Sequence, residues 1–217
     1  MISKPFFSIA IPFFYRNHKS LKQLHRCIKS IQLQKFKDYE IIISTQNKYD
    51  DLKNDGNLKE VSILDAEFIK GFIQGNINNA IRKSNGEWIK IVFSDDFFDD
   101  NYAFNKIYEA LKNNKNNWAL INSLHYSESR NRIFSPLIPY YQNNILEINT
   151  IGSPSALLKR NDGFLFFDEK TWMRLDVDYY FNLYKNYGKP YYIRNVYVIN
   201  EIHIDQFSSL MKNINTE

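Results

Sequence analysis

The chain has 217 residues, of which 44% are hydrophobic and 16% are aromatic, and this composition excludes an intrinsically disordered protein. A chain of this length buries roughly 70–75% of the surface that its unfolded form exposes, so a sizeable core can form without disulfides. The formal charge of +4, from 28 basic and 24 acidic residues, gives no reason to expect a nucleic-acid partner, because such proteins concentrate basic residues on one face.

The first half of the chain predicts alternating strands and helices. Continuous apolar runs predict buried strands at residues 6–14, 40–44, 61–64, 88–93 and 118–124. Apolar residues spaced three and four apart predict helices that begin near Asn17, Ile73 and Phe104, and Gly86 is expected to end the second of them. A strand, a helix and a second strand of these lengths imply parallel strands joined by a right-handed crossover.

The second half of the chain is less regular. Two prolines within residues 133–149 indicate a loop or an antiparallel excursion there. Residues 176–187 predict a helix that ends at Gly188, and its inward residues are expected to be Val177, Tyr180, Phe181 and Tyr184. Residues 191–198 predict a last strand. No internal repeat or linker divides the sequence, which indicates a single α/β domain.

Two adjacent acidic residues, Asp95 and Asp96, directly follow the predicted strand at 88–93. Ligands bind beyond the carboxyl ends of parallel strands in open α/β sheets, so these carboxylates are expected at the ligand-binding edge. Desolvation makes them poor core residues, and a hard divalent cation is a natural partner for their oxygens. The pair is also compatible with a cap of the next helix, or with a solvated loop that includes Asp99 and Asp100.

The end of the first predicted strand offers a second candidate site. Residues 12–17 read Pro-Phe-Phe-Tyr-Arg-Asn. Their aromatic side chains can stack on a base, and Arg16 can contact a phosphate. A proline and aromatic residues after a strand are also common packing residues, and Arg16 is equally explained as a surface charge at the start of a helix.

The order of these segments resembles the family 2 glycosyltransferases, which have the GT-A fold. The segments that carry the resemblance are 8–17, 39–44, 76–81, 85–91 with the following acidic pair, 152–156, 167–169, 175–178 and 203–208. Residues 152–156 resemble the acceptor-side loop of the family, residues 175–178 its region with the catalytic carboxylate, and residues 203–208 its terminal loop with a histidine. The resemblance extends over nearly the whole chain.

The resemblance implies a GT-A-like α/β fold, a Rossmann-type three-layer sandwich with a mainly parallel central sheet. It implies one domain over residues 1–217, with a nucleotide-sugar-binding half to about residue 124 and an acceptor-binding half from about residue 125. The implied activity is an inverting transfer of a sugar from a nucleoside-diphosphate sugar, UDP-linked, to an acceptor hydroxyl. The implied acceptor is a glycan or glycolipid in the assembly of a surface polysaccharide or lipooligosaccharide.

The resemblance also assigns roles to individual residues. It implies that Asp176 is the general base for the acceptor hydroxyl, with Asp178 as the alternative. The implied donor contacts are Pro12, Phe14, Arg16, Thr45, Gln46, Asn78, Asp95 and Asp96. The implied metal ion is Mn²⁺ or Mg²⁺, held by Asp95, Asp96 and His203. Spacing alone explains Asp176 and Asp178 equally well as acids that interact with a helix dipole, and Asn78 as an exposed helical residue.

Several positions depart from the family pattern. Thr45 and Gln46 stand where the family has an Asp that contacts the base, Phe93 where its metal motif has a further acid, and Leu175 where its catalytic helix has a Glu. These departures leave a non-catalytic nucleotide-sugar or carbohydrate-binding module as an alternative function. A sugar nucleotidyltransferase is a further alternative, although it requires a glycine-rich phosphate loop, and residues 12–17 contain no glycine.

Cys27 is the only cysteine, which excludes an internal disulfide and fits a reducing compartment. The N-terminus lacks the apolar core of a signal peptide, and no run of ~18 apolar residues predicts a membrane span. We therefore expect a cytoplasmic protein, and the composition permits peripheral contact with the inner face of a membrane. The sequence specifies no oligomeric state.

Overall fold

The computed structural model describes residues 4–66, 73–171 and 173–202. The strands are β1 Phe7–Phe13, β2 Tyr39–Thr45, β3 Ser62–Asp65, β4 Trp88–Ile91, β5 Trp118–Ser127, β6 Arg132–Leu137, β7 Leu157–Arg160 and β8 Tyr191–Glu201. The α-helices are α1 His18–Gln32, α2 Tyr49–Lys53, α3 Ile73–Arg82, α4 Ala103–Leu111 and α5 Leu175–Tyr187. Short 3-10 turns lie at Gly56–Leu58, Glu128–Arg130 and Pro154–Ala156.

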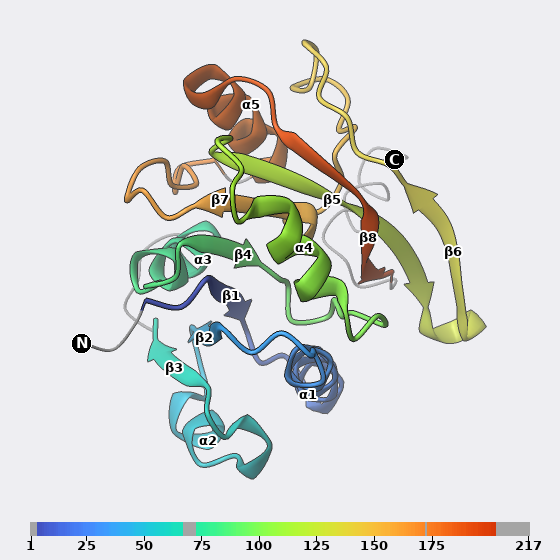
Figure 1. Cartoon of the computed structure of the whole chain (residues 1–217). Helices are drawn as coiled ribbons and strands as arrows, with labels where there is room; N and C mark the ends of the chain where they lie inside the picture. The colour runs from blue at the N-terminus through green and yellow to red at the C-terminus, as the bar shows by residue number, and fades with distance from the viewer. Residues whose placement is uncertain (1–3, 67–72, 172, 203–217) are drawn as a thin grey trace, which may run out of the picture.

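The described strands form one eight-stranded sheet in the order β3-β2-β1-β4-β7-β5-β6, and β8 pairs with β5 (Figure 1). β1 pairs in parallel with β2 and β4, and β2 pairs in parallel with β3. β7 is antiparallel to both β4 and β5, whereas β8 is parallel to β5. The parallel sheet predicted for the first half of the chain is confirmed, and β7 joins it to the second half.

Helices cover both faces of the sheet, as a three-layer sandwich requires (Figure 1). Buried residues of α1 and α4 pack with Ile9 and Ile11 of β1 on one face. Buried residues of α3 and α5 pack with Ala10 of β1 on the other face. Because neighbouring residues of a strand point to opposite faces, the unbroken apolar sequence of β1 contributes to both layers of the core.

A capping box fixes the start of α1. The Asn17 side chain accepts a hydrogen bond from the Ser20 backbone N–H at 3.1 Å, and the Ser20 hydroxyl accepts one from the Asn17 N–H at 3.2 Å. These bonds satisfy backbone donors that the first turn of a helix leaves without an intrahelical partner. Beyond the cap, Leu24, Ile28 and Ile31 are buried, so the amphipathic helix predicted from this point is confirmed.

The second half contains elements that the sequence pattern did not predict. β6 is antiparallel to β5, which confirms an antiparallel excursion within residues 133–149, but β7 was not expected at all. The buried residues of α5 are Val177, Tyr179, Tyr180 and Leu183. Phe181 and Tyr184, which were expected to face inward, are half-buried. The apolar face of α5 is therefore rotated from the predicted one.

Gly86 lies just before β4, whereas α3 already ends at Arg82, so the prediction that Gly86 ends this helix is wrong. The Gly86 N–H donates to the Ser8 hydroxyl at 2.7 Å, across two neighbouring strands. A Cβ atom on Gly86 would lie 2.6 Å from the carbonyl carbon of Phe7. Glycine is needed here because the backbones of β1 and the start of β4 approach so closely.

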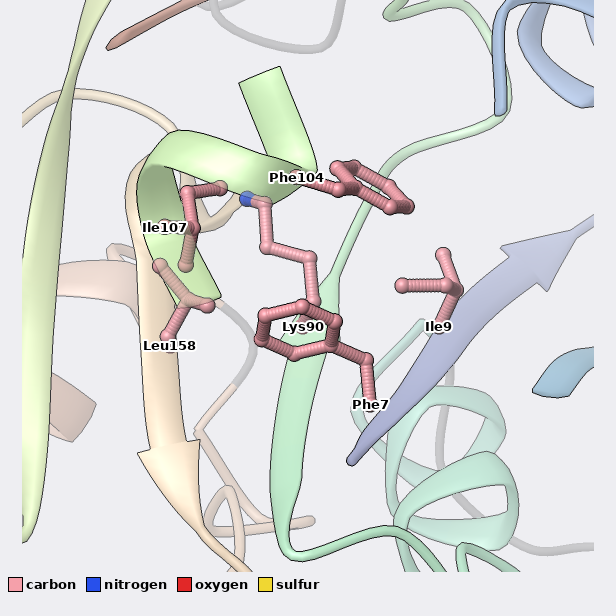
Figure 2. A pocket seen from close by; sticks show the side chains of 6 residues that line it. All are labelled: Phe7, Ile9, Lys90, Phe104, Ile107 and Leu158. Atoms are coloured by element: carbon pink, nitrogen blue, oxygen red, sulfur yellow. The ribbon is translucent and has the colours of Figure 1, made fainter. Parts of the chain in front are cut away.

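Lys90 is a buried lysine within β4. Figure 2 shows its side chain among Phe7, Ile9, Phe104, Ile107 and Leu158. The space between these side chains offers no room for a water molecule. The ammonium group donates to the backbone carbonyls of Ile91, at 3.1 Å, and of Ser155. Burial lowers the pKa of Lys90 to about 7, although Asp96 and Cys27 act in the opposite direction.

Candidate active site

The carboxyl ends of β1, β2 and β4 lie at the same edge of the sheet, because these strands are parallel. β7 runs the other way and pairs its start with the end of β4, Leu158 lying opposite Lys90. The turn at Pro154–Ala156 is therefore at this edge too. The Phe93 N–H donates to the Ser155 hydroxyl at 2.8 Å, which ties the residues after β4 to this turn.

Residues 93–97, here called the acid corner, contain two of the three predicted metal ligands. Asp96 is only 3% exposed, and its carboxylate accepts hydrogen bonds from the Asn200 side-chain amide at 2.7 Å and from the Glu201 N–H at 3.3 Å. Burial, and then the neighbouring Asp95, raise the pKa of Asp96 well above its usual range. A buried carboxylate that is already held by β8 argues against the prediction that Asp96 binds a metal ion or the donor.

Asp95 occupies a different environment from its neighbour. It is half-buried, and its backbone carbonyl accepts a hydrogen bond from the Arg26 guanidinium at 2.7 Å. Among the residues that the structure describes, no three His, Cys, Asp or Glu side chains are grouped as metal ligands. His203, the third predicted ligand, lies outside the described residues. Mg²⁺ is commonly held by one or two carboxylates together with substrate phosphates, and Asp95 fits that kind of partial site.

The ends of β1 and β2 carry the other predicted donor contacts. Pro12 is buried within β1, whereas Phe14 is 50% exposed and Arg16 is also exposed. Thr45 is buried, and its hydroxyl donates to the Asn47 carbonyl at 2.5 Å. Gln46 is half-buried. Phe14, Arg16 and Gln46 therefore remain candidates for contact with a donor, and the Thr45 hydroxyl is engaged within its own turn.

Asn47 joins the two strand ends and was not predicted as a site residue. Its side-chain oxygen accepts from the Tyr15 N–H at 2.8 Å, and its amide nitrogen donates to the Tyr15 carbonyl at 2.9 Å. A hollow of about 290 Å³ lies beside this link, between the starts of α1 and α2. Its lining residues are Tyr15, His18, Leu21, Lys48, Asp51, Leu52 and Asp55. Asn47 thus fixes the segment that presents Phe14 and Arg16.

Asn78 differs from both explanations that the sequence offered. It is fully buried, so it is not an exposed helical residue. Its side-chain oxygen accepts from the Phe167 N–H at 2.9 Å, and its nitrogen donates to the Phe167 carbonyl and to the Glu169 carboxylate, each at 2.9 Å. These contacts fasten α3 to the segment before α5. They argue against the prediction that the Asn78 amide binds the donor.

Asp176 lies in the first turn of α5, where Arg174 precedes it with a left-handed backbone φ of 54°. Its carboxylate accepts a hydrogen bond from the Asn149 amide at 2.5 Å. The Asn149 side-chain oxygen accepts from the Gly152 N–H at 2.8 Å, so Asn149 closes its own turn and holds Asp176 against it. Burial raises the pKa of Asp176, although nearby backbone N–H groups act in the opposite direction.

Asp178, the alternative base, has other neighbours. Its carboxylate accepts from the Asn182 amide at 3.2 Å, one turn further along α5. Burial raises the pKa of Asp178, and the charge of Asp168 raises it further. Asp176 and Asp178 are therefore directed to different surroundings, as their spacing of two helical positions requires.

A continuous set of contacts connects the acid corner with Asp176. The Ser155 hydroxyl accepts a hydrogen bond from the Phe93 N–H in the acid corner. The chain from Ser155 back to Gly152 leads to the turn that the Asn149 side chain closes. The Tyr180 hydroxyl of α5 donates to the Gly152 carbonyl at 3.0 Å and so fixes α5 to the same turn. The structure thus brings the ends of β1, β2 and β4 and the start of α5 to one edge of the sheet.

The amino-acid sequence of residues 8–174 matches the model of glycosyl transferase family 2, and the chain belongs to this family. One relative among curated proteins is the GalNAc(5)-diNAcBac-PP-undecaprenol beta-1,3-glucosyltransferase of Campylobacter jejuni subsp. jejuni serotype O:2, which is 37% identical over 101 residues. The match covers 42% of this chain and 30% of the relative. The chain therefore matches less than a third of the length of this relative.

Solved structures of TarS from S. aureus are similar to the chain. TarS 1–349 in complex with UDP-GlcNAc has a TM-score of 0.71 at 16% identity, over 94% of this chain and 60% of that one. TarS of greater length has a TM-score of 0.69 at 17% identity, over 97% of this chain and 39% of that one. This likeness concerns the fold, and it confirms the GT-A-like α/β sandwich that the sequence predicted.

Proposed function

We propose that the chain transfers a sugar from a UDP-linked donor to an acceptor hydroxyl, with inversion at the anomeric carbon. The observation that carries this proposal is the shared position of Asp95 and Asp176. Asp95 follows β4, Asp176 begins α5, and the contacts through Ser155, Gly152 and Asn149 connect them at the ligand-binding edge of the sheet. We assign the first carboxylate to the donor and the second to the acceptor.

The reaction requires a base at the acceptor. The acceptor oxygen forms a bond to the anomeric carbon, the bond from this carbon to the diphosphate oxygen breaks, and the diphosphate leaves with the electron pair. We assign the hydroxyl proton to the carboxylate of Asp176. Its raised pKa supports this role, because a general base is more effective when its pKa lies closer to the working pH. Attack from the face opposite the diphosphate gives inversion.

Asp95 is the residue that we propose as the protein ligand for Mn²⁺ or Mg²⁺. Such an ion supplies neutralisation of the charge that develops on the departing diphosphate. Asp96 supports the position of the acid corner from within the fold and does not act as a ligand in this proposal. We assign contact with the nucleoside part of the donor to Phe14, Arg16 and Gln46, which follow β1 and β2.

The nature of the donor and acceptor is inferred from the relatives. Structures of TarS 1–349 were determined in complex with UDP and with UDP-GlcNAc, which supports a UDP-linked donor for this chain. The Campylobacter relative is named for an undecaprenyl diphosphate-linked glycan, which supports a lipid-linked glycan acceptor in surface-glycan assembly. Within the described residues, no helix has the length and apolar character needed to cross a membrane.

The acceptor side offers one exposed aromatic residue. Tyr140 is 51% exposed, whereas the neighbouring Tyr141 stacks on Tyr184 with ring centroids 3.8 Å apart. The two neighbouring tyrosines therefore differ in environment. We propose Tyr140 as the residue that contacts an acceptor sugar.

A panel of nucleotide sugars tests the proposed function. Release of nucleoside diphosphate and calorimetric binding are measured with UDP-, GDP- and CDP-linked sugars, in Mn²⁺ and in EDTA. We expect UDP-linked donors to bind and turn over in Mn²⁺, and the product to have the anomeric configuration opposite to that of the donor by NMR. Binding without turnover, with any polyprenyl-diphosphate glycan as acceptor, would instead support the non-catalytic module.

A further inference from the structure

Arg26 connects α1 to the ends of β4 and β8. Its Nη2 atom donates to the Asp95 carbonyl at 2.7 Å and also contacts the carboxylate of Glu201, the last residue of β8. The guanidinium carbon lies 4.3 Å from the centroid of the Phe97 ring and 5.5 Å from that of Tyr126. The contact between Arg26 and Glu201 therefore joins residues that are 175 positions apart in the sequence.

The buried carboxylate of Glu201 strongly restricts the position of the Arg26 side chain. Its side chain is 1% exposed, whereas that of Arg26 is 33% exposed. A buried carboxylate is costly unless a cation and hydrogen bonds compensate for the lost water. Among the described residues, Arg26 forms an ion pair with one carboxylate oxygen of Glu201, and the Lys19 ammonium lies 3.8 Å from the other. The position of Arg26 is thereby fixed by Glu201, and the position of the Asp95 backbone is fixed by Arg26.

Further hydrogen bonds connect the end of β8 with the acid corner. Phe97 and Ile199 exchange two backbone hydrogen bonds, of 3.0 Å and 2.8 Å. The Asp96 carboxylate accepts from the Asn200 side chain and from the Glu201 N–H. Asp95 directly precedes Asp96 in the chain, and Arg26 contacts its backbone carbonyl. Arg26 therefore constrains the direction of the chain at the carboxylate that the proposed function assigns to the donor.

We propose that Arg26 is a positioning residue for the donor site, which holds the Asp95 backbone so that the Asp95 carboxylate points to the donor diphosphate. This inference rests on the proposed function for the role of Asp95. Arg26 contacts the Asp95 carbonyl and the Glu201 carboxylate, and it acts on the donor only through the acid corner. Partners that orient a ligating residue typically contribute about 10–100-fold to metal affinity or activity.

Arg160 provides a matched control for Arg26. It also contacts a carboxylate, Glu87 at 2.7 Å, a backbone carbonyl, that of Asn116 at 3.3 Å, and an aromatic ring, Trp88 with a centroid distance of 4.7 Å. Its side chain is 28% exposed. However, Arg160 pairs with Trp88 at the start of β4, at the opposite edge of the sheet from the acid corner. Replacing either arginine removes similar contacts, but only Arg26 lies next to the proposed donor site.

The test compares Arg26→Gln with Arg160→Gln in the full chain. The dissociation constant of UDP in the presence of Mn²⁺ is measured by calorimetry, together with Tm and hydrogen exchange at the Phe97, Ile199 and Glu201 amides. We expect Arg26→Gln to raise the dissociation constant about 10–100-fold and to accelerate exchange at these amides, whereas Arg160→Gln lowers Tm and changes neither quantity. Unchanged UDP affinity in Arg26→Gln, or an equal loss in Arg160→Gln, overturns the inference.

Two further outcomes keep this inference separate from the proposed function. If the wild-type chain binds no UDP with Mn²⁺, the proposed function fails. Faster hydrogen exchange in Arg26→Gln would then still support Arg26 as the residue that holds the acid corner in place. Unchanged exchange would overturn this structural role as well. If Arg26→Gln does not fold, Arg26→Lys replaces it. Lysine keeps a charge next to Glu201 but lacks the planar fork of donors, so weaker UDP binding in a folded Arg26→Lys supports the inference and unchanged binding overturns it.

Discussion

The Asn149 amide donates a hydrogen bond of 2.5 Å to the Asp176 carboxylate, and this bond joins two segments that are 27 residues apart. It gives the first turn of α5 a fixed partner in the turn that ends at Gly152. A carboxylate that is both half-buried and held by one directed donor has few accessible orientations. This relationship favours Asp176 over Asp178 as the proposed base.

Asp176→Asn should reduce sugar transfer by about 10²–10⁴-fold, the usual contribution of a general base, because the amide has nearly the same shape but cannot take the proton. Binding of UDP and Mn²⁺ should remain within error of wild type. Asp178→Asn is the control and should cost much less, since the Asp178 carboxylate contacts Asn182 and not the Asn149 turn. Initial rates and calorimetry measure both effects. A dead Asp178→Asn with an active Asp176→Asn would transfer the base role to Asp178.

The rate of transfer should fall on the acid side as Asp176 becomes protonated, and burial places this fall at a higher pH than for an exposed Asp. Asn149→Ala removes a donor that stabilises the charged carboxylate, so the pKa of Asp176 should rise further. The acid limb of the kcat/KM profile should therefore move to higher pH in Asn149→Ala. The profile is measured between pH 4 and pH 9, with Gln142→Ala as a control in the same loop. An unshifted acid limb would contradict control of Asp176 by Asn149.

Asp95→Ala should abolish metal-dependent donor binding and leave the fold intact, because the Asp95 side chain is half-buried and is not a core residue. Asp96→Ala should instead destabilise the chain, since it leaves the Asn200 amide and the Glu201 N–H without their buried acceptor. Thermal-shift titration with UDP and Mn²⁺ measures both properties. Asp99→Ala, at an exposed position nearby, is the control. A full Mn²⁺-dependent shift in Asp95→Ala would show that another residue holds the metal.

The adjacent acids illustrate how far the sequence could predict the site. A pair of aspartates after a buried strand correctly indicated the edge of the sheet at which the carboxyl ends of β1, β2 and β4 meet, because chain direction and strand order decide which strand ends meet. The pattern could not distinguish Asp95 from Asp96. The difference arises from Asn200 and Glu201, more than 100 positions later, and no local spacing contains that information.

Physical reasons also explain why the sequence pattern predicted neither β7 nor the role of Asn149. β7 has only four residues, and two of them are Lys159 and Arg160, so no apolar run marks it as a strand. Lys159 is nevertheless 1% exposed, because its ammonium group is satisfied by Asp162 at 3.3 Å and by nearby carbonyls. Asn149 was not predicted as a site residue, because turn-forming asparagines are common in loops. The local pattern is an Asn three positions before Gly152, a glycine that has a positive φ in the structure. Only the fold shows that Asp176 lies next to this Asn.

Gly86→Ala should destabilise the chain by about 1–3 kcal/mol or more, the range for overpacking in a close contact. The added Cβ would lie 2.6 Å from the Phe7 carbonyl carbon, and backbone atoms cannot move aside as a flexible side chain can. Gly56→Ala is the matched control, because no atom lies within 4 Å of its Cβ position. Urea unfolding measures both variants. Equal stability of the two would mean that β1 and β4 can separate at this point without cost.

Lys90→Met should stabilise the chain near neutral pH, because the wild type places an ammonium group in a space without water. The pKa of Lys90 is lowered to about 7 in the folded chain, from 10.5 in the unfolded one. Between these values the unfolded chain binds a proton that the folded chain lacks, so the stability of the wild type rises with pH across this window. Methionine does not titrate, and the advantage of Lys90→Met should shrink as pH increases.

Urea unfolding of Lys90→Met and wild type between pH 6 and pH 10 checks this expectation. At pH 7 the variant should be more stable by about 1–4 kcal/mol, the range observed when buried ionic groups are replaced by apolar ones. Lys159→Met is the matched control: Lys159 is equally buried, but it pairs with Asp162, so its replacement leaves that carboxylate without its cation and should cost stability. A difference between Lys90→Met and wild type that does not change with pH would show that Lys90 keeps its proton in the folded chain, with the carbonyls of Ile91 and Ser155 and the charge of Asp96 compensating for the lost water.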